Sequence, residues 1–245
     1  MTASSVYLEE CITALHRLNE TQLPAISQAA ELIATSVAGG GILYTFGTGH
    51  SHELAEDIAY RAGSLVPVSP ILEPSLTGST EVSKSEFLER LEGFAPYILD
   101  YHGVGTGDTL LIISTSGRNA APIEMALEAR KRQIPVVALT SLAYSSNISS
   151  RHSGGKMLYE LVDVVLDNGA PYGDAVVALP GVDERVGPLS TVTGSALLHS
   201  VIAGVAERLV GRMDPVPIFR SGNLDGATPQ NQRRMDPYRA RIRFW

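Results

Sequence analysis

The chain has 245 residues, of which 44% are hydrophobic and 18% charged, with a formal net charge of −7. This length supports one large domain with a substantial core. The acidic balance argues against nucleic acid as the main partner, because phosphate backbones select concentrated basic surfaces. The single cysteine, Cys11, excludes an internal disulfide and a cysteine metal cage. No apolar run reaches the roughly 20 residues that span a bilayer, so a cytoplasmic protein without membrane contact is expected.

The predicted elements begin with two helices. Apolar residues at three- and four-residue spacing indicate a helix over about 8–18 and a second over 26–37, which three consecutive glycines end. Five short apolar runs then predict strands at 42–46, 65–68, 109–113, 136–139 and 162–166. Helical patterns follow most of them, at 53–62, 121–133, around 148–159 and at 192–210. Continuous apolar runs are typical of strands buried on both faces, so we expect an α/β three-layer sandwich with a five-stranded parallel sheet flanked by helices.

Two segments do not fit this alternation. Residues 70–105 indicate a loop followed by a helix around 87–101. Residues 213–245 are rich in Pro, Asn, Arg and Gly, and their arginines predict a solvated or subunit-contacting tail. We therefore expect one domain over 1–212 and a C-terminal extension over 213–245, which packs on that domain or on a partner subunit and has no core of its own.

Polar loops follow three of the predicted strands, at the edge where parallel sheets bind ligands. The residues after the first, third and fourth strands are Gly47, Thr48, Gly49, His50 and Ser51; Ser114, Thr115, Ser116, Gly117, Arg118 and Asn119; and Thr140 and Ser141. Glycines bring backbone N–H groups close to a ligand, and hydroxyls and helix N-termini favour anions. The loops therefore predict an anion site, above all for phosphate. Plain helix capping is the alternative reading of any one such loop.

Other readings of the first loop fit less well. A dinucleotide fingerprint needs a third glycine where His52 stands, and no Gly-Lys-Ser/Thr completes a nucleotide-binding P-loop. His50 and His52 are two residues apart and point away from each other on a helix, so no metal is expected. No Gly-x-Ser-x-Gly elbow occurs, which disfavours a hydrolase. We expect no cofactor.

The motifs "GTGHS" and "STSGRN", each after a strand, resemble the SIS (sugar isomerase) domain over roughly residues 5–212. That family implies a phosphosugar bound on a five-stranded parallel sheet of flavodoxin-like order, in a homodimer or homotetramer. With "DNGAPYGDA" and "PVPIFRSGNLDGATPQNQ", the chain resembles the UPF0309 subfamily and, more distantly, phosphoheptose isomerases. The resemblance places phosphate contacts at Ser51, Ser114, Ser116 and Asn119. It leaves Thr115 and Gly117 to shape the second loop and Arg118 as an additional charge.

Aldose–ketose isomerisation needs an acid and a base across a small sugar. The resemblance implies a histidine on the last helix, which is His199, with a satisfied core histidine as the alternative. It also implies a glutamate on the helix after the first loop, but that position falls close to Arg61. We therefore expect Glu73, at the carboxyl end of the second strand, to be the carboxylate. Asn168 and Asp174 are expected to bond sugar hydroxyls, although Asp-Asn-Gly is also a routine turn.

The expected function is a cofactor-independent sugar-phosphate isomerase. A non-catalytic phosphosugar sensor or regulatory subunit, and a phosphosugar lyase or etherase, are the alternatives. Residues 1–40 lack the basic charge and recognition-helix pattern of a DNA-binding regulator. Asn223 and Asn231 suggest that the tail reaches over a partner subunit's site.

Overall fold

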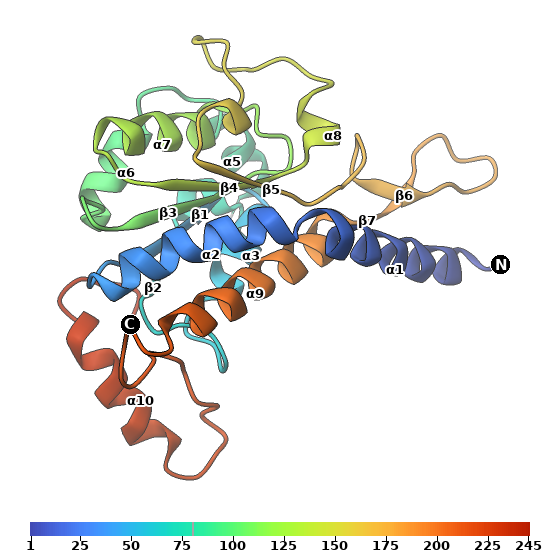
Figure 1. Ribbon diagram of the computed structural model, residues 1–245. Helices are drawn as coiled ribbons and strands as arrows, with labels where there is room; N and C mark the ends of the chain where they lie inside the picture. Colours follow the sequence, from blue (N-terminus) through green and yellow to red (C-terminus); the bar gives the residue numbers. More distant parts are fainter. Residues whose placement is uncertain (80) are drawn as a thin grey trace.

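Five parallel strands form the central sheet in the computed structural model, which describes residues 1–79 and 81–245 (Figure 1). They are β1 (Leu43–Gly47), β2 (Val68–Ile71), β3 (Thr109–Ile113), β4 (Val136–Thr140) and β5 (Val164–Asp167). Their order is β2-β1-β3-β4-β5, and each neighbouring pair is parallel. The expected α/β sandwich and flavodoxin-like order are confirmed. Gly47 lies opposite Ile113, so the loops that follow β1 and β3 leave the sheet at the same edge.

Helices cover both faces of this sheet. Figure 1 shows α2 (Leu23–Ala38) and α9 (Ser190–Leu209) side by side on one face, with α6 (Ala95–His102) and α7 (Ala120–Lys131) on the other. Alternate strand residues pack into one of two cores. Tyr44 and Phe46 join α6 and α7, whereas Leu43 and Ile113 join α2, α9 and the short helix α3 (Ser51–Asp57). This two-sided burial explains why the strands read as continuous apolar runs.

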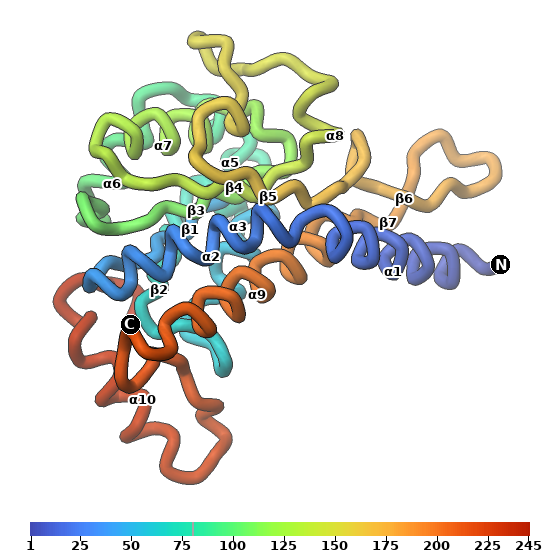
Figure 2. Tube along the Cα trace, in the orientation of Figure 1, coloured from blue at the N-terminus to red at the C-terminus, as the bar shows by residue number. Residues whose placement is uncertain are grey.

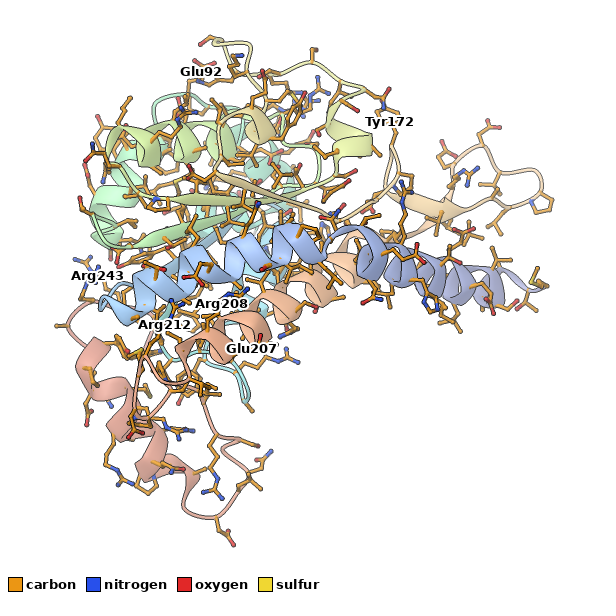
Figure 3. All side chains as sticks on the ribbon, in the orientation of Figure 1. Glu92, Tyr172, Glu207, Arg208, Arg212 and Arg243 are labelled. Carbon is orange, nitrogen blue, oxygen red and sulfur yellow. The ribbon has the colours of Figure 1, made fainter. Side chains whose placement is uncertain are left out.

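The α2–α9 pair is also tied by charge along its exposed edge. Arg208, in the last turn of α9, and Arg212, just after it, are labelled in Figure 3. Both guanidinium groups pair with Glu31 of α2. The two bonds from Arg212 hold the pKa of the Glu31 carboxyl below its usual value. Because the groups are exposed, this network contributes little beyond the apolar packing beneath it.

The N-terminal helix α1 (Ala3–Thr21) extends beyond the sheet and packs against an antiparallel hairpin (Figure 1). The hairpin strands are β6 (Ala175–Val177) and β7 (Val186–Pro188), which the sequence did not predict. Cys11 is buried against Val176 and Leu189 in a small third core. Leu8 and Ile12 of α1 are exposed.

Three sequence predictions of local structure are wrong. The run at 65–68 precedes β2 rather than forming it, because Leu65 and Val66 pair with Ile218 and Pro217 of the C-terminal segment. The helix expected around 148–159 does not form. The short helix α8 (Leu142–Ser145) ends before this range, and a long excursion then leads to a 3₁₀ turn at Leu158–Glu160 (Figure 2). The helix expected around 87–101 is two helices, α5 (Val82–Leu88) and α6, because Gly93 adopts a φ of 88° between them. A short α4 (Pro74–Thr77) precedes them.

The C-terminal segment packs on its own chain. It contains α10 (Ala227–Met235) and a 3₁₀ turn at Asp236–Tyr238. Phe219, Tyr238 and Ile242 are buried in the core that also contains Tyr44. The apolar side chains of the segment therefore become part of the main core of the domain. Among the described residues, none of the helices has both the length and the apolar character needed to cross a membrane.

Candidate functional site

The first loop turns tightly out of β1 and starts α3. A Cβ added at Gly47 would lie 2.5 Å from the Ser51 carbonyl oxygen, so only glycine permits this approach. The Ser51 N–H donates to the Thr48 carbonyl at 3.0 Å. Gly49 adopts a φ of 51°, and the ring of His52 hydrogen-bonds its carbonyl. Within the described residues, the Ser51 hydroxyl has no hydrogen-bond partner and is partly exposed.

The second loop is braced from beneath. Ser114 Oγ accepts the Gly117 N–H at 3.2 Å. Gly117 has a φ of 58°, and a Cβ there would lie 3.2 Å from both Leu158 and Thr140. Thr140 Oγ1 donates to the Thr115 carbonyl at 3.2 Å. Thr140, expected to contact substrate, therefore supports the loop in this structure.

A glutamate that the sequence analysis missed joins the two loops. Thr48 Oγ1 and Asn119 Nδ2 each donate to one oxygen of the Glu89 carboxylate, both at 2.6 Å. The Ala121 N–H, in the first turn of α7, donates to the Glu89 carbonyl at 2.9 Å. Burial raises the pKa of Glu89, although the Thr48 hydrogen bond and the charges of Arg90 and Arg151 act against the rise. Glu89 therefore lies within the expected phosphate site.

The remaining side chains of the second loop hold it to the 146–157 excursion. Arg151 Nη1 donates to Asn119 Oδ1 at 3.0 Å, and Arg118 Nε donates to the Ser149 carbonyl at 3.0 Å. Both ends of the Asn119 amide are thus engaged within the protein. The Ser116 and Thr115 side chains have no hydrogen-bond partner among the described residues and are partly exposed. Together with Ser51, they are the hydroxyls open to a ligand.

A cavity of about 230 Å³ lies beside the first loop. Residues of the first loop, α3 and the α4–α5 connection line it: Gly49, His50, His52, Glu53, Thr77, Gly78, Ser79 and Val82. His50 is exposed there. We call the two loops Gly47–Ser51 and Ser114–Asn119 the cradle, and the structure places this cavity next to it.

A histidine and an aspartate form a hydrogen-bonded pair at the far end of α3. His199 Nε2 lies 2.9 Å from Asp57 Oδ2, and Ser195 Oγ donates to the same oxygen at 3.3 Å. Arg61 also pairs with Asp57. The His199 side chain is 38% exposed, so the core-histidine alternative is wrong.

Glu73 follows the carboxyl end of β2, as expected, but its carboxylate is engaged within the protein. Its carboxylate caps α4, where it accepts the Ser75 N–H at 3.3 Å and the Ser75 hydroxyl at 2.7 Å. The carboxylate that the structure brings to His199 is Asp57. The sequence analysis did not propose Asp57 as a catalytic carboxylate.

Asn168 and Asp174 lie away from the cradle. Asn168 is fully buried, its Oδ1 accepts the Ala170 N–H at 3.0 Å, and it borders a cavity of about 360 Å³ between α1 and the β6–β7 hairpin. Asp174 caps α9, since its carboxylate accepts both the N–H and the hydroxyl of Ser190 at 2.8 and 2.6 Å. The Asn168 contact corresponds to the routine-turn alternative, whereas the cap formed by Asp174 was not expected.

One group among the described residues has metal-ligand chemistry, namely Glu92, Glu124 and His152. The Gly154 N–H donates to His152 Nδ1 at 3.0 Å, which places the proton of the neutral ring on Nε2. Nε2 faces the two glutamates at 3.8 Å each. A metal would need the Nε2 lone pair. Glu92, which is labelled in Figure 3, also accepts a hydrogen bond from the Ser153 N–H. The group therefore ties the excursion to α7.

Five parallel strands with polar loops at the carboxyl ends of β1 and β3 define an α/β sandwich domain. The chain belongs to the SIS domain family, whose model matches residues 6–141. Its relatives include the UPF0309 protein of Oceanobacillus iheyensis, 41% identical over 245 residues and all of both chains. The UPF0309 protein of Geobacillus thermodenitrificans is 42% identical over 217 residues, which cover 89% of this chain and 87% of that protein.

Solved structures share the fold at lower identity. Phosphoheptose isomerase from Neisseria gonorrhoeae is 20% identical, with a TM-score of 0.55 over 83% of this chain and 97% of that one. The NanR protein of Vibrio vulnificus complexed with ManNAc-6P is 19% identical, with a TM-score of 0.55 over 88% of this chain and 66% of that one.

Proposed function

We propose that the chain binds a phosphorylated sugar with its phosphate in the cradle. The observation that carries this proposal is the convergence of two glycine-containing loops at one sheet edge, with the Ser51 and Ser116 hydroxyls free to donate. The twelve-residue helix α7 starts at the second loop and adds the positive end of its dipole. Membership of the SIS family supports the same ligand class.

We further propose that the bound sugar is isomerised by His199 and Asp57. Ser51 and Asp57 begin and end α3, and the six helical steps between them correspond to a rise of about 9 Å. A sugar held by its phosphate at Ser51 would place its other end near Asp57. One group of the pair removes the proton from the carbon next to the carbonyl, and the other protonates the carbonyl oxygen. The first group then returns its proton to the former carbonyl carbon, while the second takes the proton of the neighbouring enediol hydroxyl. Both groups regain their starting states, and no redox cofactor is needed.

A thermal-shift screen of aldose and ketose phosphates tests the binding proposal, and NMR of the mixture tests turnover. Stabilisation together with an isomerised product is expected. Stabilisation without product would favour the sensor alternative, and elimination of a substituent would favour a lyase. Stabilisation by none of the sugar phosphates would overturn the proposal.

Ser116→Ala should weaken phosphosugar binding without changing the fold. The lost hydroxyl donates to a charged oxygen, a bond worth about 1.5–3 kcal/mol, so the dissociation constant should rise by roughly 10- to 100-fold. Isothermal titration calorimetry measures it. The matched control is Ser146→Ala, because the Ser146 hydroxyl is exposed and bonds only the Leu142 carbonyl. Equal affinities of the two variants would remove Ser116 from the site.

We also propose a homodimer or homotetramer. The support is the exposed apolar stripe of Leu8, Ile12 and Leu15 on α1, three residues that share one helix face. Light scattering after size exclusion measures the mass, and a monomer at micromolar concentration would contradict the proposal.

A further inference from the structure

Glu89 occupies a special place in the sheet topology. The chain goes outward from β1 to β2 on one side, whereas β3, β4 and β5 follow on the other. The crevice between the ends of β1 and β3 is therefore the switch point, where open parallel sheets bind ligands. The Glu89 carboxylate bridges this crevice, because Thr48 follows β1 and Asn119 follows β3.

The direct partners of this carboxylate are neutral. Thr48 donates a hydroxyl and Asn119 an amide. The nearest cations are engaged with other groups: Arg90 pairs with Glu86, and Arg151 bonds the opposite end of Asn119 and lies next to Arg118. Glu86 adds a like charge. The α7 terminus contributes N–H groups, and His50 of the first loop is exposed. Among the described residues, none of the cations forms an ion pair with Glu89.

We propose that Glu89 is the residue that couples anion binding in the cradle to the uptake of one proton. In the unliganded chain its carboxylate accepts the Thr48 and Asn119 donors. When a phosphate dianion enters, a proton from solvent binds one carboxylate oxygen, and the resulting O–H donates to the anion. This inference rests on the proposed function, since it assumes that the anion binds in the cradle.

The physical reason is the repulsion of like charges at short range. Two anions in one partly buried crevice do not both stay ionised, and the group with a conjugate acid takes up a proton. Burial already raises the pKa of Glu89 before any ligand arrives, so the further rise needed is smaller than for an exposed glutamate. Anion affinity should therefore be greatest at low pH and fall as the pH rises from the pKa of Glu89 in the free chain towards its higher pKa in the complex.

Sulfate is the sharpest probe, because it remains a dianion throughout the neutral range. Its affinity for the wild-type chain, Glu89→Gln and the control Glu92→Gln is measured by isothermal titration calorimetry from about pH 6 to 8.5, a range in which phosphate itself would titrate. Repeating each titration in two buffers of different ionisation enthalpy gives the number of protons taken up. Glu92 is a fair control because it bonds Ser153 outside the cradle.

The wild-type chain and Glu92→Gln should take up close to one proton per sulfate, with a dissociation constant that rises by up to about tenfold per pH unit. Glu89→Gln should take up none, bind with the same affinity at every pH, and bind more tightly than the wild type at high pH. A residue that only holds the loops would not produce this difference in proton number.

Equal sulfate affinity of wild type and Glu89→Gln at every pH would overturn the inference, as would no sulfate binding by either chain. If sugar phosphates still stabilise the chain in that case, the proposed function stands. If neither sulfate nor any sugar phosphate binds, both proposals fall.

Discussion

Replacing His199 by Ala is expected to reduce kcat by roughly 10²- to 10⁴-fold, the usual contribution of a positioned acid or base. Binding of the sugar phosphate should change little, because His199 bonds Asp57 at one end of α3 and the cradle lies at the other end. The Ser195 hydroxyl, which bonds the same oxygen of Asp57, remains in the variant. NMR of product formation gives kcat, and calorimetry gives the affinity. A loss of turnover with retained affinity is the signature of a group that acts on the reacting carbons.

Two carboxylate variants identify the partner of His199. Asp57→Asn keeps the shape of the side chain but removes its charge, so turnover should fall strongly. Glu73→Ala should have little effect on kcat, since that carboxylate caps α4 through Ser75. The reverse order would make Glu73 the catalytic carboxylate. His16→Ala is the control for removal of a histidine, because His16 lies at an exposed position of α1. Full turnover in His199→Ala would contradict the acid/base role of His199.

The strands were predictable where burial on both faces left an unbroken apolar run. The run at 109–113 coincides with β3, and those at 42–46 and 136–139 lie within one residue of β1 and β4. The run at 65–68 misled because its partner, Ile218, is far away in sequence. An apolar run in a sequence indicates that its residues are buried, but it does not indicate which segment they pack against. The same limit hid the role of Phe219 and Ile242 in the main core.

The loops of the site were predictable because their chemistry is local. Glycines and hydroxyls at a strand end show directly in the sequence around Gly47 and Gly117. Glu89 and Asp57 carry no such signal, since each looks like an ordinary acidic residue of a helical segment. Their partners Thr48 and His199 lie 41 and 142 positions away. Only the fold brings these pairs together. The sequence analysis therefore chose Glu73 as the catalytic carboxylate, because its position at the end of a strand could be read from the sequence.

Removing the Arg241 side chain should lower the free energy of unfolding by about 2–3 kcal/mol. Both oxygens of Asp108 accept from Arg241 at 2.7 Å, and the Asp108 side chain is fully buried at the start of β3. Breaking a buried pair leaves an uncompensated charge, at a typical cost of about 3–5 kcal/mol. Arg241 is itself 40% exposed, and Asp108 keeps its bonds from the Ile42 and Gly105 N–H groups, so a smaller loss is expected.

The matched control for Arg241→Ala is Arg239→Ala, two residues earlier in the same segment. Arg239 pairs with Asp236 three residues away, and both side chains are largely exposed, so its removal should cost less than about 1 kcal/mol. Urea denaturation of both variants gives the difference from the wild type. The Arg241–Asp108 pair also holds the C-terminal segment 213–245 against the domain. Removal of the Arg241 side chain should therefore make this segment susceptible to proteolysis before the sheet unfolds. Equal stabilities of the two variants would show that the buried aspartate is satisfied by its backbone donors alone.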